Sequence, residues 1–135
     1  MGLSGAYRIL LIILTGACYV FIHEFGHYAM AAEYQLSPNF VYGSYGSSNI
    51  LGMALGVSHR ATTPVQSFFV VFGATIVPLA LAVFLTGAAV LKGNEDMALM
   101  AEVMILLIMI NLIPIPGVGN MDANRIWNYL LGMHI

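Results

Sequence analysis

The chain has 135 residues, enough for one compact domain, and a net charge of −2. Hydrophobic residues make up 60% of it and charged residues only 7%, against about 25% charged in ordinary soluble domains. So few charges cannot cover a water-facing surface, and no basic cluster suits nucleic acid. We therefore expect a single membrane-embedded domain over residues 1–135, a multi-pass integral protein for which we expect the cell membrane.

The first apolar segment covers about residues 9–32. Arg8 and the apolar residues after it resemble the start of a signal peptide. The stretch continues past Cys18, the single cysteine, into His-Glu-Phe-Gly-His at residues 23–27, without a clean cleavage site before the histidines. Since it exceeds the roughly 20 residues that a helix needs to cross a bilayer, we expect a retained transmembrane helix.

The next segment has the pattern of a β-hairpin. From Leu51 to Val57, larger apolar residues alternate with small ones, and this period of two is typical of a strand. Phe40-Val41-Tyr42 is a plausible partner strand, and Gly46-Ser47-Ser48-Asn49 supplies turn residues between them. We predict a hairpin over about residues 39–58, with a plain connector as the alternative.

Two further apolar segments follow, over about residues 65–91 and 97–113. The third stops before Pro114 and Pro116, which cannot continue a helix without loss of hydrogen bonds. Helix is the conformation expected for all three segments, since a lipid-exposed backbone must satisfy its own hydrogen bonds.

The C-terminal part begins with an irregular loop over residues 117–121. Residues 122–133 then predict a short helix, in which Arg125 and Trp127 suit a membrane interface. The expected fold is an all-α membrane protein with three transmembrane helices, a β-hairpin between the first two, and a short C-terminal helix.

Glu24 is the one charged residue that we expect deep inside a span. At about 1.5 Å per residue, the neighbouring His23 lies roughly 15 Å from the Glu33 end of the first helix. A carboxylate at that depth is costly, and this favours a functional role.

The spacing of the histidines specifies that role. His23 and His27 are separated by four residues, so both lie on one face of a helix and can bind one metal ion. Glu24 can reach a water molecule beside that ion, and H-E-x-x-H is the arrangement of zinc metalloproteases. The alternative is a buried polar cluster that joins helices by hydrogen bonds, which does not explain the spacing.

Catalytic zinc usually takes three protein ligands, so a third is required. The candidates are Glu33, His59, Asp96, Glu102, Asp122 and His134. With three spans, the C-terminal ends of the first and third lie on the same side of the membrane, and Asp122 follows the third. The other reading of Asp122 is an N-cap of the last helix, which is compatible with metal binding. We predict one zinc ion per chain, bound by His23, His27 and Asp122.

Three stretches of the sequence resemble the site-2 proteases, a family of intramembrane zinc metalloproteases. His-Glu-Phe-Gly-His-Tyr at residues 23–28 resembles the family's zinc-binding helix, followed there too by a hairpin. Asn-Leu-Ile-Pro-Ile-Pro-Gly at 111–117 resembles the stretch before its aspartate ligand, and residues 122–126 resemble its aspartate-glycine segment. Ala123 stands where the family prefers glycine, and Val77 or Leu81 stands about where it has an asparagine.

The resemblance implies a minimal three-helix catalytic core whose hairpin and C-terminus face the cytoplasm. It makes Asn111 a candidate for lining the site, with a helix-terminal asparagine as the alternative. The resemblance also implies that the substrates of this protein are transmembrane segments of other proteins within the lipid bilayer.

The sequence thus predicts a zinc metalloendopeptidase that hydrolyses peptide bonds in or near transmembrane segments, with Glu24 as the general base. An edge of the hairpin could bind the unwound substrate by strand addition. One alternative is a membrane metal-ion transporter or channel, since intramembrane His, Glu and Asp also line ion pathways. Another is an inactive relative that only binds membrane segments. Replacing Glu24 distinguishes the three hypotheses, because only the protease hypothesis requires this carboxylate for turnover.

Overall fold

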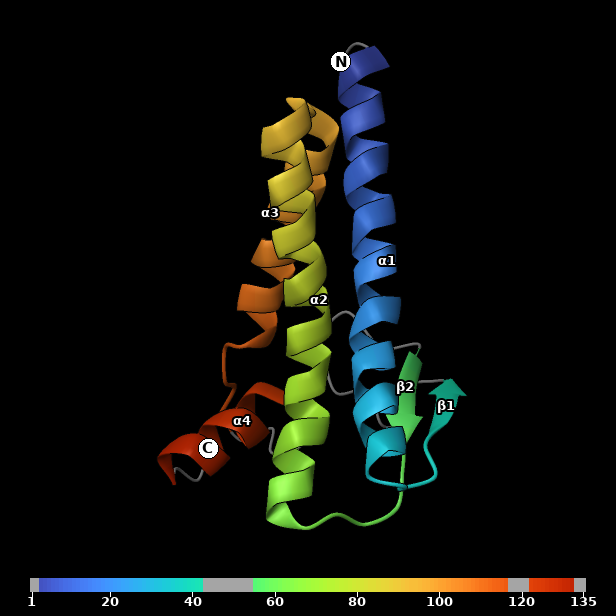
Figure 1. Cartoon of the computed structure of the whole chain (residues 1–135), viewed down its shortest axis with the longest axis vertical. Helices are drawn as coiled ribbons and strands as arrows, with labels where there is room; N and C mark the ends of the chain where they lie inside the picture. Colours follow the sequence, from blue (N-terminus) through green and yellow to red (C-terminus); the bar gives the residue numbers. More distant parts are fainter. Residues whose placement is uncertain (1–2, 43–54, 117–121, 133–135) are drawn as a thin grey trace.

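The computed structural model describes residues 3–42, 55–116 and 122–132. This part of the chain forms four helices and one antiparallel pair of strands (Figure 1). In chain order these are α1 (Leu3–Glu33), β1 (Asn39–Tyr42), β2 (Leu55–Ser58), α2 (Pro64–Lys92), α3 (Glu95–Asn111) and α4 (Asp122–Leu131). The mostly helical fold and the hairpin agree with the sequence prediction. The expected turn at residues 46–49, the alternation over 51–54 and the loop at 117–121 lie outside the described residues.

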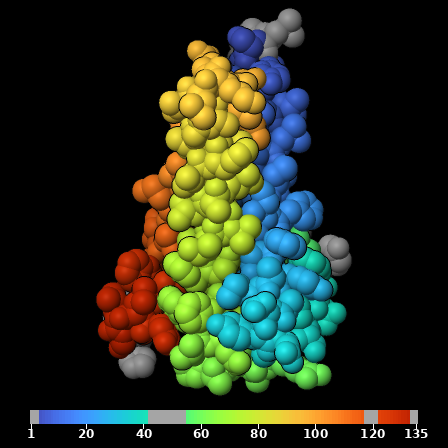
Figure 2. Space-filling model, viewed as in Figure 1, coloured from blue at the N-terminus to red at the C-terminus, as the bar shows by residue number. Residues whose placement is uncertain are grey.

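The three long helices run side by side in alternating directions (Figure 1). The hairpin and α4 lie at one end of this bundle, and the N-terminus lies at the other. The space-filling view shows the same elongated shape, with α4 packed against the side of the bundle at that end (Figure 2). The C-terminal ends of α1 and α3 therefore lie at the same end of the bundle as α4, as alternating helix directions require.

Local signals set the ends of α2. Thr63 caps its first turn in a reciprocal capping box with Gln66, and Pro64 occupies the first turn, where its missing N–H costs nothing. At the other end Gly93 takes a left-handed conformation (φ 61°) that glycine adopts without strain. Asn94 then caps α3 by accepting from the N–H groups of Asp96 and Met97. This short turn reverses the chain and makes α2 and α3 antiparallel neighbours.

The hairpin is tied to the C-terminal end of α1. Its strands pair in antiparallel register, with Asn39 opposite Ser58 and Phe40 opposite Val57. The Phe40 ring stacks on Tyr28 of α1 at a centroid distance of 4.8 Å, and Leu55 of β2 is buried. The hairpin is thus fixed beside the same end of α1 that carries the histidines.

Two helices, over Ser4–Glu33 and Pro64–Lys92, are long and apolar enough to cross a membrane. Inside the bundle, all three helices contribute to one apolar cluster. Its buried members are Tyr19, Ala82, Leu85, Ala101, Met104 and Ile108. Many large apolar side chains also face outward, among them Ile13, Phe21, Val83, Phe84 and Leu106. The third helix, α3, has 17 residues, about 26 Å of length, against a hydrocarbon core of about 30 Å.

The backbones of α1 and α2 come into contact at Gly26 and Gly73. A Cβ atom added at Gly26 would overlap the carbonyl oxygen of Gly73 and lie 2.7 Å from the Cα atom of Ala74. Small residues at helix crossings allow this approach in membrane proteins. Gly26 lies between the two histidines, so the contact brings the α2 backbone against both imidazole rings.

We expect Gly26→Ala to destabilise the protein by about 1–3 kcal/mol, because backbone atoms of α2 leave no room for a methyl group. The control is Gly87→Ala in α2, where an added Cβ meets nothing within 4 Å and a better helix former should be neutral or stabilising. Thermal unfolding of both variants in detergent measures the difference. Equal melting temperatures for the two would contradict the close crossing.

Candidate metal centre

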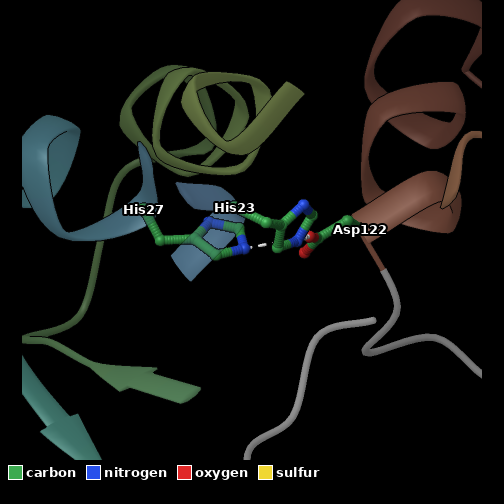
Figure 3. A group of neighbouring side chains, drawn as sticks. All are labelled: His23, His27 and Asp122. Atoms are coloured by element: carbon green, nitrogen blue, oxygen red, sulfur yellow. Dashed lines mark hydrogen bonds and ion pairs between the residues drawn. The ribbon is translucent and has the colours of Figure 1, made fainter. Parts of the chain in front are cut away.

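Two imidazoles and one carboxylate converge at the buried junction of α1, α2 and α4 (Figure 3). The Nε2 atoms of His23 and His27 each lie 2.9 Å from Oδ2 of Asp122. One ligand atom from each residue lies within 4.8 Å of the others. His23 and Asp122 are only 1% and 3% exposed. The structure therefore brings together the three residues that the sequence predicts as metal ligands, and this group could hold a metal ion.

The backbone of α2 determines how the His27 ring is oriented. His27 Nδ1 lies 3.0 Å from the carbonyl oxygen of Val70. A carbonyl oxygen can only accept, so Nδ1 must carry the proton and donate it. In a neutral ring this leaves a lone pair on Nε2. Ligating histidines usually have such an outer partner, which fixes the tautomer and the ring orientation.

A proton or a metal ion must therefore lie between His27 Nε2 and the Asp122 carboxylate. A lone pair on His27 Nε2 would otherwise face a carboxylate oxygen at 2.9 Å. A second proton on the ring, a proton on the carboxyl oxygen or a metal ion resolves this repulsion. Because His23 Nε2 lies equally close to the same oxygen, one metal ion among the three groups would serve both rings. Two imidazole nitrogens and a carboxylate oxygen are a donor set that zinc accepts.

The two histidines favour the ionised form of Asp122. Burial opposes its ionisation, but His27 and His23 outweigh that effect and lower the pKa of the carboxyl to about 2. Its second oxygen, Oδ1, is buried and has no hydrogen-bond partner among the described residues. A buried carboxylate oxygen without a partner is costly in a metal-free site.

Two side chains of α4 fix Asp122 in place by binding the chain that follows α3. The Asn124 side chain accepts from the N–H of Ile115 (2.8 Å) and donates to its carbonyl (2.6 Å). Trp127 Nε1 donates to the carbonyl of Leu112 at 2.8 Å. These bonds satisfy the backbone where the prolines end the helix. Neither role was predicted, because no local pattern indicates which carbonyl a side chain will meet.

Glu24 and Asn111 lie beside this group but outside it. Glu24 is 0% exposed, follows His23 in the chain, and lies close enough to His27 for their charges to interact. Asn111 is buried at the end of α3, and its amide donates to the Tyr19 hydroxyl at 2.6 Å. Asn111 is thus connected to the site through Tyr19, which the sequence analysis did not single out.

The other candidates for the third ligand lie elsewhere. Glu33 and Glu102 are exposed, and Asp96 accepts from Tyr7 at the opposite end of the bundle. The His59 ring contacts the carbonyl of Arg60, and His134 lies outside the described residues. Among the described candidates, Asp122 is the one that joins the histidines.

Searches against protein-family models, curated proteins and solved structures found no match for this chain. The identity of the site therefore depends on its own geometry and donor chemistry.

We expect Asp122→Asn to weaken zinc binding by more than about 100-fold, since it removes the negative ligand, whereas outer partners typically contribute 10- to 100-fold. Asp96→Asn, on an exposed residue at the far end, is the matched control. Competition with a chromogenic chelator measures both affinities. An unchanged affinity in Asp122→Asn would remove this residue from the ligand set.

Proposed function

We propose that this protein is an intramembrane zinc metalloendopeptidase that resembles the site-2 proteases. Its substrates would be peptide bonds in or near transmembrane segments of other membrane proteins. The observation that carries the proposal is the buried group of His23, His27 and Asp122, with the buried carboxylate of Glu24 next to it on an apolar helix.

A location within the bilayer is supported by the outward faces of the bundle. Large apolar side chains cover them, and a soluble monomer rarely exposes so much apolar surface. With α1 and α2 as spans, we propose α3 as a third, because its outward side chains Ile105, Leu106 and Met109 are apolar and exposed. The histidines would then lie below the membrane surface, since His23 is ten residues from the end of α1.

The residues present can perform hydrolysis. A bound zinc ion would polarise the scissile carbonyl and acidify a water molecule. Glu24 would accept the proton from the attacking water and pass it to the leaving amine. His23, His27 and Asp122 would hold the centre rigidly, since each side chain contacts a residue of another helix. The buried surroundings would exclude competing water from the reacting groups.

The distribution of buried polar groups favours a protease over a metal transporter. A transport pathway needs polar groups along the whole membrane depth. In the described residues, the buried part of α2 consists of apolar residues, namely Val70, Val71, Gly73, Ala74, Pro78, Ala82, Leu85 and Ala89. The charged and imidazole groups instead gather at one level, where a single reaction centre would be.

An inactive relative is disfavoured by two features of the site. The Glu24 carboxylate is retained, although a protein that only binds membrane segments would not need a general base. Ala123 stands where the family prefers glycine, yet it is buried and Asp122 still reaches both histidines. The additional methyl group is therefore accommodated without loss of the third ligand.

Substrate would bind as an extended segment, because a helix hides its peptide bonds. Each strand of the two-stranded sheet pairs on one side, so an outer edge could accept a further strand. In a Glu24→Gln background, we expect a cysteine at Ser58 to cross-link to a cysteine near the scissile bond of a substrate. A cysteine at Lys92, at the far end of α2, is the control. Equal cross-linking at the two positions would contradict strand addition at β2.

We expect Glu24→Gln to lower the rate of proteolysis by roughly 10²- to 10⁴-fold or more, since this is the usual contribution of a general base. Glutamine fills the same space but cannot accept the proton. Zinc content and folding should persist, because the three ligands remain. Glu33→Gln, on the exposed end of the same helix, should leave cleavage unchanged.

Co-expression with a cleavable membrane substrate compares the products of these variants. Near-parental cleavage by Glu24→Gln would refute the role of Glu24 as general base. Loss of cleavage together with loss of zinc would make Glu24 a ligand instead.

A further inference from the structure

Tyr19 lies one helical turn before His23 on α1, and its side chain is only 1% exposed. Its hydroxyl has three polar neighbours. They are His23 Nδ1 at 3.4 Å, the Asn111 amide nitrogen at 2.6 Å and the Leu107 carbonyl oxygen at 3.5 Å. The hydroxyl therefore links the first predicted metal ligand to the C-terminal turn of α3.

The chemistry of these neighbours restricts the hydroxyl to two arrangements. A tyrosine hydroxyl has one proton to donate and can also accept. The Asn111 amide nitrogen can only donate, so it uses a lone pair of the hydroxyl, and the Leu107 carbonyl can only accept. Either the hydroxyl donates to His23 Nδ1, or it accepts a proton from Nδ1 and donates its own to Leu107.

A metal ion at Nε2 of His23 would select the second arrangement. A neutral imidazole that binds metal through Nε2 carries its proton on Nδ1. We propose that Tyr19 is a positioning residue of the metal centre: its hydroxyl accepts the Nδ1 proton of His23 and turns its own proton to Leu107. This inference rests on the proposed metal-dependent function. Tyr19 would do for His23 what the Val70 carbonyl does for His27.

The carbonyl of Ala74 is the other acceptor beside the His23 ring. The Tyr19 hydroxyl lies 3.4 Å from His23 Nδ1, so this ring nitrogen has a side-chain acceptor as well as the Ala74 backbone. Removing the hydroxyl should leave the Nδ1 proton with the Ala74 backbone as its remaining acceptor, and losing a buried hydrogen-bond partner is costly.

The test is Tyr19→Phe, which keeps the ring and removes the hydroxyl. We expect zinc affinity, measured by chelator competition, to fall by roughly 10- to 100-fold. Tyr28→Phe, whose ring stacks on Phe40, should bind zinc like the parent. A purely structural role for Tyr19 would lower the melting temperature of the metal-free protein and leave the affinity of the folded protein unchanged.

A second measurement does not require the variant to fold. In the zinc-loaded parent with ¹⁵N-labelled histidine, His23 should show a protonated, hydrogen-bonded Nδ1. An unprotonated Nδ1, or parental zinc affinity in Tyr19→Phe, would overturn the role of Tyr19, the latter implicating Ala74. A parent that binds no zinc would instead overturn the metal centre itself, and so the two failures are distinguishable.

Discussion

The arrangement of this molecule depends on one carboxylate oxygen held between two imidazole nitrogens. Oδ2 of Asp122 lies 2.9 Å from Nε2 of both His23 and His27. Because all three groups are buried, their polar atoms cannot turn to water, and burying them without compensation would cost several kcal/mol. A cation at their meeting point removes that cost. The same contact joins α4 to α1, so a metal ion bound there would also hold the end of the bundle together.

The rest of the bundle supports this point of contact. The glycines at the crossing of α1 and α2 let backbone carbonyls of α2 reach the imidazoles, and the Val70 carbonyl sets the proton on His27. Asn124 and Trp127 attach α4 to the unwound chain after α3. Polar groups therefore surround the site on several sides, while the outward faces remain apolar. Such a division would suit the proposed hydrolysis, which needs water inside a membrane.

Much of this arrangement could be predicted from local sequence. Apolar runs and the two prolines predicted the three long helices, the hairpin strands were found at 39–42 and 55–58, and the last helix begins at Asp122 as expected. The histidine pair followed from helical spacing, and Asp122 from the alternation of helix directions. Tyr19, Asn124 and Gly73 were missed because their roles depend on contacts between distant elements. The sequence around such a residue does not indicate which atoms of a distant element it will contact.

The central claim is that His23, His27 and Asp122 bind zinc as one centre. X-ray absorption spectroscopy at the zinc edge of the purified protein tests it most directly. We expect about one zinc per chain in a four-coordinate site, with two imidazole nitrogens at about 2.0–2.1 Å and oxygen ligands at about 2.0–2.2 Å. A correctly folded protein that takes up no zinc, or zinc whose spectrum lacks imidazole scattering, would contradict the account.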